Sequence, residues 1–393
     1  MIPRNACPVC TSLATEVFLR RPGVPVHQNQ LCGTVESAVA ATRGDLEMTV
    51  CRDCGFVFNR TFDETRLSYG DDYQNSQICS PFFQEYVDGL VHRIVDDLGI
   101  RGKRIVEVGC GKGYFLERLV RADPGNRGAG YDTSYEGPEV AMEGRLTFHR
   151  RYYGGASDAA QPPDAVVCRH VIEHVAEPAA MLQSIRAALH IAHHNSAPDA
   201  VVVFETPCVE WILRNRVIWD FFYEHCSLFS AASLTTLFER CGFTVTGVRH
   251  VFNDQYLWLE ARPAVRPGTA PLHPGSIVEA CRDFAGFERE LVEGWRARIR
   301  ALSENGGVAL WGAGAKGVTF AGLVDAERTF IDCVVDLNPQ KQGHFVAATG
   351  HPIVPPADLA GRGVRNVVLM NPNYEAENRA IAAQAGLDLQ FIA

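Results

Sequence analysis

The stretch that decides the fold is Val106-Glu107-Val108-Gly109-Cys110-Gly111-Lys112-Gly113-Tyr114-Phe115-Leu116. A β-branched run leads into three glycines, and an apolar helical pattern follows them. Glycines let the backbone turn sharply and approach a ligand closely, and a helix N-terminus offers unpaired N–H groups. The stretch therefore predicts a strand, a ligand-binding turn and a helix. Its spacing, Glu-x-Gly-x-Gly-x-Gly, differs from the Gly-x-Gly-x-x-Gly of dinucleotide sites.

The flanking sequence continues the alternation of strands and helices. Apolar runs that predict strands are separated by amphipathic patterns, which implies parallel pairing through crossover helices. These runs lie at 104–108, 127–132, 164–168, 200–204, 307–311, 331–335, 366–370 and 387–392, and a helix is predicted at 277–304. We therefore expect an α/β protein with a small N-terminal domain over 1–68, a central Rossmann-like domain over 69–270 and a C-terminal Rossmann-like domain over 271–393.

Composition narrows the class of protein. The 393 residues, 47% of them hydrophobic, suffice for two or three domains. The formal charge of -9 argues against a nucleic-acid partner. No apolar run reaches the roughly 18 to 20 residues that span a bilayer, so we predict no membrane partner. Thirteen cysteines, an odd number, favour a reducing compartment. A cytoplasmic protein is predicted.

Two Cys-x-x-Cys pairs mark the N-terminal region, Cys7 with Cys10 and Cys51 with Cys54. Each pair can present two thiolates, and four thiolates complete a tetrahedral Zn²⁺ shell without an open position. A structural zinc site is predicted, with buried thiols or a redox pair as the alternative. Forty residues separate Cys10 from Cys51, so an excursion must loop out between the pairs.

Two further features follow predicted strands of the central domain. Asp132 ends the strand after the glycine stretch, where a carboxylate can accept both hydroxyls of a ribose. The run Arg169-His170-Val171-Ile172-Glu173-His174 follows the strand at 164–168. His and Glu at this spacing can bind a metal, and a metal on His170, Glu173 and His174 remains an alternative.

The glycine turn, the acid and the strand at 164–168, in this order, resemble class I S-adenosylmethionine (SAM)-dependent methyltransferases. In that family the turn passes beside the amino-acid end of SAM. The resemblance implies SAM as cofactor and these SAM-binding residues: Glu107, Gly109, Cys110, Gly111, Gly113, Tyr114, Asp132, Arg169 and His170.

A second resemblance rests on Glu224-His225-Cys226-Ser227-Leu228-Phe229-Ser230. Its Glu-His-x-x-x-Phe-Ser pattern is similar to that of three-domain sugar-nucleotide C-methyltransferases of deoxysugar pathways, which also carry a four-cysteine zinc domain and a C-terminal α/β domain. The resemblance covers essentially the whole chain. It implies methyl transfer to a carbon of a nucleotide-linked keto-deoxysugar, with His225 as base and Glu224 and tyrosines assisting. Phe222 occupies one tyrosine position of that family, so Tyr223 and Tyr73 complete the predicted catalytic set.

The chemistry suits a histidine. Carbon methylation beside a ketone needs a base that removes an α-proton, and an ordinary imidazole, with a pKa of about 6.5, is neutral at cellular pH. Alternatively, His225 only packs or caps. The Phe222 difference also leaves room for an O- or N-methyltransferase or another SAM-consuming enzyme, and a non-catalytic SAM-binding module is a further alternative.

A second glycine-rich turn reads Leu310-Trp311-Gly312-Ala313-Gly314-Ala315-Lys316-Gly317. Backbone N–H groups and a lysine suit a diphosphate. Gly314, Lys316 and Asp336 are therefore predicted to bind the nucleotide-sugar, in line with the C-terminal domain of the family it resembles. An NAD site and a purely structural module are the alternatives.

Overall fold

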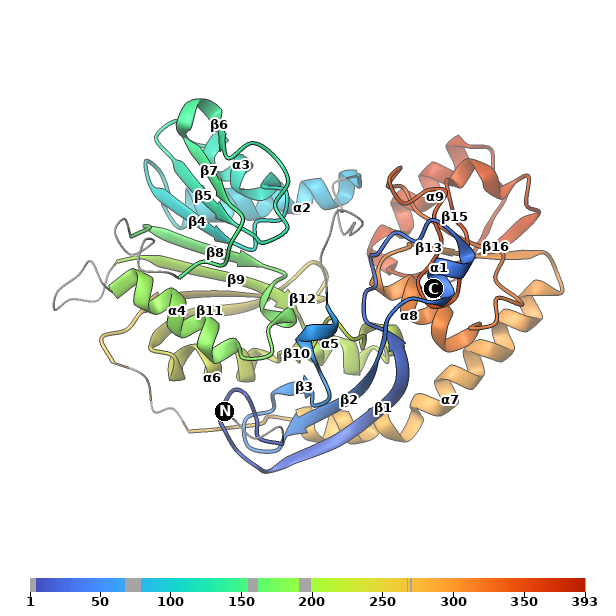
Figure 1. Cartoon of the computed structure of the whole chain (residues 1–393), viewed down its shortest axis with the longest axis horizontal. Helices are drawn as coiled ribbons and strands as arrows, with labels where there is room; N and C mark the ends of the chain where they lie inside the picture. Colours follow the sequence, from blue (N-terminus) through green and yellow to red (C-terminus); the bar gives the residue numbers. More distant parts are fainter. Residues whose placement is uncertain are drawn as a thin grey trace.

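The computed structural model describes residues 5–67, 79–154, 162–190, 199–266, 268 and 271–392. Within these ranges the chain forms three β-sheets with helices packed against them (Figure 1). The α/β class with two Rossmann-like sheets and a cysteine-bearing N-terminal part is confirmed.

The central sheet has eight strands in the order β11-β12-β9-β8-β4-β5-β7-β6. Five neighbouring strands, β9 to β7 in this order, run parallel, and the edge strands pair antiparallel. Because parallel strands end at one edge, the residues that follow them gather there. The strands are β4 (Arg104–Val108), β5 (Arg127–Tyr131), β6 (Val140–Ala141), β7 (Leu146–His149), β8 (Ala165–Arg169), β9 (Val201–Pro207), β11 (Phe243–Val251) and β12 (Tyr256–Pro263).

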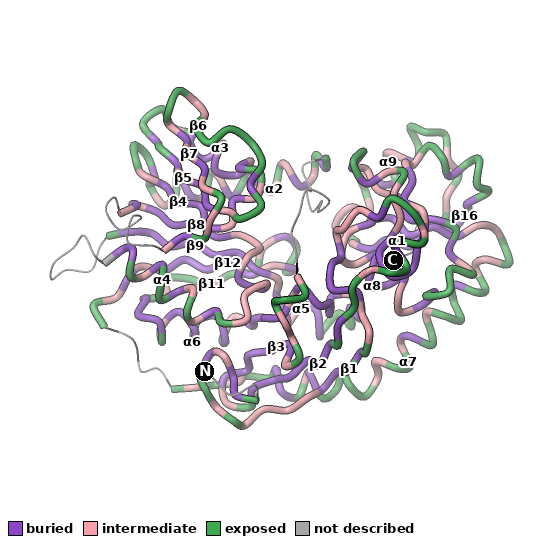
Figure 2. The backbone as a smooth tube through the Cα atoms, viewed as in Figure 1, coloured by how far each residue is buried: buried purple, intermediate pink, exposed green. Residues whose placement is uncertain are grey.

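Helices cover both faces of this sheet. Successive side chains of a strand point to opposite faces, so Val166 joins the core under α4 and α6 while Val167 joins the core under α2 and α3. Figure 2 shows the central strands buried between these layers. The helices of this part are α2 (Pro81–His92), η2 (Arg93–Asp97), α3 (Tyr114–Arg121), η3 (Met142–Gly144), η4 (Ile172–His174), α4 (Pro178–His190), α5 (Val209–Arg214), η5 (Ile218–Asp220) and α6 (Ala231–Arg240).

The N-terminal sheet is antiparallel and includes one strand from a distant part of the sequence. Its order is β1-β2-β3-β10, and β10 lies within the Glu224–Ser230 segment that contains the predicted base. Its apolar residues share one core with α5 and α7. The elements are β1 (Thr15–Pro25), α1 (Val35–Val39), β2 (Arg43–Cys51), β3 (Val57–Asn59), η1 (Glu64–Arg66) and β10 (Ser227–Leu228).

The predicted excursion between the cysteine pairs includes a segment, residues 26–42, that we call the N-terminal strap. It lies against the C-terminal domain, where Figure 1 shows α1. The N–H of Phe345 donates to the carbonyl of Cys32 (2.9 Å), and that of Ala348 donates to the carbonyl of Ala38 (2.8 Å). The strap thus links the cysteine-bearing part to the far end of the chain.

The C-terminal sheet is parallel, in the order β15-β14-β13-β16-β17. The predicted helix and the strand at 307–311 agree with α7 and β13. The strand predicted at 331–335 begins two residues later, because the N–H of Ile331 donates to the Asp325 carboxylate (2.8 Å). The elements are α7 (Ile277–Ser303), β13 (Gly307–Trp311), α8 (Ala315–Val324), β14 (Cys333–Val335), β15 (Ile353–Val354), η6 (Pro356–Leu359), β16 (Val364–Leu369), η7 (Pro372–Tyr374), α9 (Glu375–Gln384) and β17 (Gln390–Ile392).

None of the helices in the described ranges is both long enough and apolar enough to cross a membrane.

Candidate active site

The first glycine turn, residues 109–113, joins β4 to α3. Gly109, Gly111 and Gly113 have φ values of +73°, +51° and +80°, which residues with a Cβ rarely adopt. A Cβ on Gly109 would lie 2.1 Å from Cγ2 of Val171, whereas one on Gly111 would meet no atom within 4 Å. The turn is therefore packed at its start and has space beside its middle.

Two carboxylates hold this turn. Asp132, directly after β5, accepts a hydrogen bond from the N–H of Gly111 (2.8 Å). Glu107 lies beneath the turn and accepts one from the N–H of Leu116 (3.1 Å). Burial raises the pKa of the Glu107 carboxyl to about 8. Glu107, predicted to contact the cofactor, thus fixes the start of α3 from below. The other two predicted residues, Cys110 and Tyr114, are buried and half-buried.

A polar cluster lies beside the turn, where β8 and β9 end. At its centre, Glu205 accepts hydrogen bonds from Nε of Arg169 (2.5 Å) and from the Tyr86 hydroxyl (2.5 Å). Nε2 of His170 lies 3.5 Å from the same carboxylate, and the Arg169 guanidinium covers the Phe115 ring of α3 at 4.3 Å. The structure therefore brings Arg169 and His170 together beside the first turn.

In this cluster, charge pairing shifts the pKa values further than burial shifts them in the opposite direction. Burial alone would raise the pKa of Glu205, but Arg169 and His170 lower it to about 2. Burial would lower the pKa of His170, but Glu205 and Glu173 raise it to about 9. At neutral pH the site thus holds a carboxylate between two cations.

Sequence reasoning missed Glu205 and Tyr86. Glu205 lies near the end of a parallel strand, at the edge where Asp132 and Arg169 were already placed, and this position is a signal that the sequence contains. Tyr86 carries no such signal, because only the packing of α2 brings it to Glu205 (2.5 Å).

The predicted base, His225, is half-buried in the loop between η5 and β10. Its ring centroid lies 4.0 Å from that of Phe222 and 4.8 Å from that of His174, which ends η4 after β8. Burial, and then repulsion from His174, His170 and Lys316, lower the pKa of His225 well below 6.5. Its imidazole is therefore neutral at neutral pH and able to accept a proton.

The other predicted catalytic residues have different surroundings. Buried Glu224 accepts a hydrogen bond from the N–H of Gln28 in the strap (2.8 Å). The buried hydroxyl of Tyr223 accepts one from the N–H of Asp63 (2.9 Å), so it faces the N-terminal part of the chain. Tyr73 lies outside the described residues.

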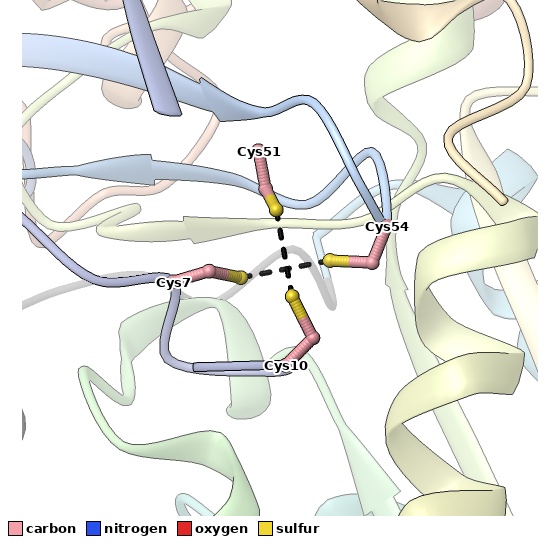
Figure 3. Close-up of side chains that lie close together, drawn as sticks. All are labelled: Cys7, Cys10, Cys51 and Cys54. Atoms are coloured by element: carbon pink, nitrogen blue, oxygen red, sulfur yellow. Dashed lines mark hydrogen bonds between the residues drawn. The ribbon is translucent and has the colours of Figure 1, made fainter. Parts of the chain in front are cut away.

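The four predicted zinc ligands converge from two turns (Figure 3). Sγ of Cys7 lies 3.5 Å from Sγ of Cys54, and Sγ of Cys10 lies 3.5 Å from Sγ of Cys51. All four are buried, and their sulfur atoms lie within 4.8 Å of one another. Tetrahedral bonds of about 2.3 Å to zinc place sulfur atoms about 3.8 Å apart. The set therefore fits a closed zinc shell.

The second glycine turn, residues 312–317, is covered by other parts of the chain. Asp336 accepts a hydrogen bond from the N–H of Ala313 (2.9 Å). Nζ of Lys316 pairs with the Asp220 carboxylate of η5 (2.6 Å), and a Cβ on Gly314 would lie 3.8 Å from Oδ1 of Asn29 in the strap. The three predicted substrate residues thus lie close together, and each contacts or faces another residue of this chain.

Comparison with known proteins identifies the chemistry. A family model described as a methyltransferase domain matches residues 82–248, and one described as a C-methyltransferase C-terminal domain matches residues 279–388. C-methyltransferase NovU from Streptomyces niveus is 27% identical over 95% of this chain and 91% of its own length. The chain is a methyltransferase. The match to NovU extends the resemblance to a C-methyltransferase over 95% of the chain.

Other relatives match a smaller share of the chain. A ubiquinone biosynthesis O-methyltransferase from Actinobacillus pleuropneumoniae is 31% identical over 28% of the chain and 47% of its own length. Among solved structures, an N,N-8-amino-8-demethyl-D-riboflavin dimethyltransferase from Streptomyces davawensis is 24% identical, with 47% of this chain and 55% of that chain covered and a TM-score of 0.34.

The residues of the methyltransferase domain fit its methyl donor. The first turn has space beside Gly111, and the half-buried Asp132 carboxylate lies next to it. Nη2 of Arg169 is buried with no hydrogen-bond partner, and a ligand carboxylate is a suitable acceptor for such a charged donor.

Proposed function

We propose that this enzyme is a cytoplasmic C-methyltransferase that acts on a nucleotide-linked keto-deoxysugar. The similarity to a C-methyltransferase over nearly the whole chain supports methyl transfer to carbon, and the acceptor class is the one that the Glu224–Ser230 resemblance implies. In the proposal the backbone of residues 109–113, Asp132 and Arg169 hold SAM. When bound, SAM supplies an electrophilic methyl group on a sulfonium.

The observation that carries the proposal is the position of His225. Its ring lies 4.8 Å from that of His174, at the edge of the sheet where the donor site is proposed. The neighbouring Glu224 is bonded to Gln28 of the strap, which also contacts the C-terminal domain. In the proposal His225 lies between the SAM-binding turn and the C-terminal Rossmann-like domain. This position suits an acceptor that carries both a reactive carbon and a nucleotide.

The side chains around His225 support proton abstraction from a carbon. Its depressed pKa keeps the imidazole neutral, with a ring-nitrogen lone pair for the α-proton of a keto-sugar, but the same burial weakens His225 as a base. Removal of the α-proton would leave an enolate. The Phe222 ring, 4.0 Å away by centroid, excludes water from one side and limits loss of the enolate to protonation. Orientation of the acceptor carbon then supplies much of the rate.

Zinc has a structural role in this proposal. Four thiolates fill its shell, so it has no position for a substrate or for water. Cys7, Cys10, Cys51 and Cys54 would join the two N-terminal turns and so fix the base of the strap.

Proton exchange tests the carbon reaction directly. The enzyme is incubated in heavy water with a panel of nucleotide-linked keto-sugars, without SAM, and exchange at the α-carbon is followed by NMR. We expect exchange with wild-type enzyme and a loss of about 10²- to 10⁴-fold in His225→Ala, the usual contribution of a general base. Labelled SAM then locates the methyl group in the product.

The matched control is His250→Ala, because His250 is an exposed histidine of β11 whose Nε2 lies 3.7 Å from the Glu210 carboxylate. It should exchange like wild type. Methyl transfer to an oxygen or nitrogen without α-proton exchange would contradict the carbon reaction and favour the O- or N-methyltransferase alternative. Exchange that survives His225→Ala in folded, SAM-binding protein would remove His225 as the base.

A further inference from the structure

The loop of His225 and the turn after β8 bring three metal-ligating side chains together. Glu173, His174 and His225 each offer one ligand atom, and these atoms all lie within 4.8 Å of one another. We call these residues the Glu-His-His triad. Two imidazoles and a carboxylate form a donor set that zinc, cobalt and nickel accept.

The triad is largely buried and contains an unpaired nitrogen, as a ligand-binding site does. Glu173 has no exposed surface, and His174 and His225 are half-buried. Nδ1 of His174 is buried and has no hydrogen-bond partner. Such an orphan nitrogen inside a protein is costly unless a ligand satisfies it.

Outer residues orient the carboxylate of the triad. Thr206 of β9 donates a hydrogen bond to Oε2 of Glu173 (3.1 Å), and Nδ1 of His170 lies 3.3 Å from Oε1. Metal-ligating carboxylates are commonly held by such outer partners, which contribute to metal affinity. The ligands also come from two separate segments, η4 and the loop before β10, so a bound ion would join them.

We propose that the Glu-His-His triad is a second metal site, distinct from the four cysteines. The triad binds one divalent transition-metal ion, and this ion inhibits the enzyme. Three protein ligands leave a fourth position for water. A nitrogen of His225 bound to the ion cannot take a proton, so a filled triad removes the base. Inhibition rests on the proposed function of His225, whereas binding does not.

Cobalt(II) tests the site in zinc-loaded protein. Cobalt bound to nitrogen and oxygen gives weak visible bands, whereas thiolate ligands add intense charge-transfer bands. We expect one equivalent of cobalt to bind beyond the resident zinc, with visible bands and without charge-transfer bands. His174→Ala should weaken this binding at least about ten-fold, and Thr206→Val should weaken it about ten-fold through the outer shell.

Two controls keep the test specific. His250→Ala removes a histidine that lies near Cys208 and Glu210, another group of possible ligands, and should leave the cobalt spectrum unchanged. Circular dichroism and zinc content show that each variant is folded. No additional equivalent of cobalt, binding that survives His174→Ala, or binding that is lost in His250→Ala would overturn the site.

Activity separates the two proposals. Methyl transfer should fall in proportion to the cobalt bound at the triad and return when a chelator too weak to strip the cysteine site removes it. Full activity with a filled triad would overturn the inhibitory role. If no keto-sugar is methylated or exchanges protons, the proposed function fails, but the cobalt spectra still decide the metal site.

Discussion

The two glycine turns follow the same local plan in two domains. Each follows a buried strand and precedes a helix, and each is tied by a carboxylate from the neighbouring strand end, Asp132 at Gly111 (2.8 Å) and Asp336 at Ala313 (2.9 Å). They differ in what covers them. The first has space beside Gly111, whereas the second faces the strap at Gly314.

The residues around the turns explain this difference. Glu107 lies two positions before Gly109, whereas the buried Leu310 lies two positions before Gly312. Lys341 is buried beside the second turn, where its ammonium donates to the Ala313 carbonyl (3.0 Å) and to Oδ1 of Asn29 in the strap (2.9 Å). Lys341 and the strap therefore cover the second turn, whereas the first turn has space beside Gly111.

Removal of zinc should have the largest effect of the changes considered. It should disturb the strap that covers the second turn but leave ligand binding at the first turn unchanged. Cys7→Ser or Cys54→Ser breaks the predicted shell, whose metal supplies on the order of 10 kcal/mol of folding free energy in small zinc domains. We expect the strap to become sensitive to proteases, while the SAM dissociation constant measured by calorimetry changes by less than about two-fold. The cysteines share a core with Val106 and Val108 of β4, but the hydrogen bonds that hold the first turn come from Asp132 and Glu107. Cys241→Ser, in a buried cysteine at the end of α6, is the control. Loss of SAM binding together with zinc would show that the first turn also depends on the N-terminal part.

Alanine substitutions in the two turns should have the next largest effect. In Gly109→Ala the new Cβ meets Val171 at 2.1 Å, and in Gly317→Ala it meets the Gly312 carbonyl oxygen at 2.0 Å. Both changes should lower the free energy of unfolding by about 1 to 3 kcal/mol. Only Gly109→Ala should weaken SAM binding, by roughly a hundred-fold, about 2.7 kcal/mol. Equal loss of SAM affinity in both variants would mean that the effect is one of general stability.

Sequence patterns predicted the parts of the fold that local residues determine. The strand, turn and helix around Gly109 and the parallel strands beside them follow from periodicity and glycine chemistry. The N-terminal sheet was not predicted, because register shifts at 17/19 and 21/24 break the alternation of β1 and because β10 comes from a distant segment.

The site divides in the same way. The cysteine pairs and Asp132 can be read from spacing along the chain. Glu205 with Tyr86, Lys316 with Asp220, and His174 with His225 meet only through tertiary packing. The resemblance to C-methyltransferases pointed to His225, but it did not indicate that Tyr223 faces Asp63 (2.9 Å).

The carboxyl beneath the first turn should make the stability of the protein depend on pH between about 5 and 8. Burial raises the folded-state pKa of Glu107 to about 8, above its unfolded value of about 4.3. Between these values the unfolded chain holds fewer protons than the folded one, so this residue makes stability fall as the pH rises. In urea unfolding, the free energy of unfolding of Glu107→Gln relative to that of wild type should therefore rise by about 1 to 3 kcal/mol from pH 5 to pH 8. The same comparison with Leu310→Met should show no pH trend, and a constant difference for Glu107→Gln would contradict the raised pKa.

The last comparison concerns Lys316, which pairs with Asp220 (2.6 Å) and also lies over the Trp211 ring (5.2 Å). If a diphosphate binds at the second turn, it must share this ammonium with Asp220. Loss of one charge-assisted hydrogen bond, about 1.5 to 3 kcal/mol, then raises the KM for the nucleotide-sugar about ten-fold or more in Lys316→Gln. Asp220→Asn, which leaves the ammonium in place, should change that KM by less than about two-fold.

Steady-state kinetics of both single variants and the double variant distinguish substrate binding from positioning. A substrate-binding Lys316 gives a KM effect that the Asp220 change does not reproduce. Equal and non-additive losses of kcat in both variants, with KM unchanged, would instead make the pair a clamp that holds η5 and, five residues later, His225. The second turn would then serve the active site through the position of the base, and the nucleotide would have to bind elsewhere on the C-terminal domain.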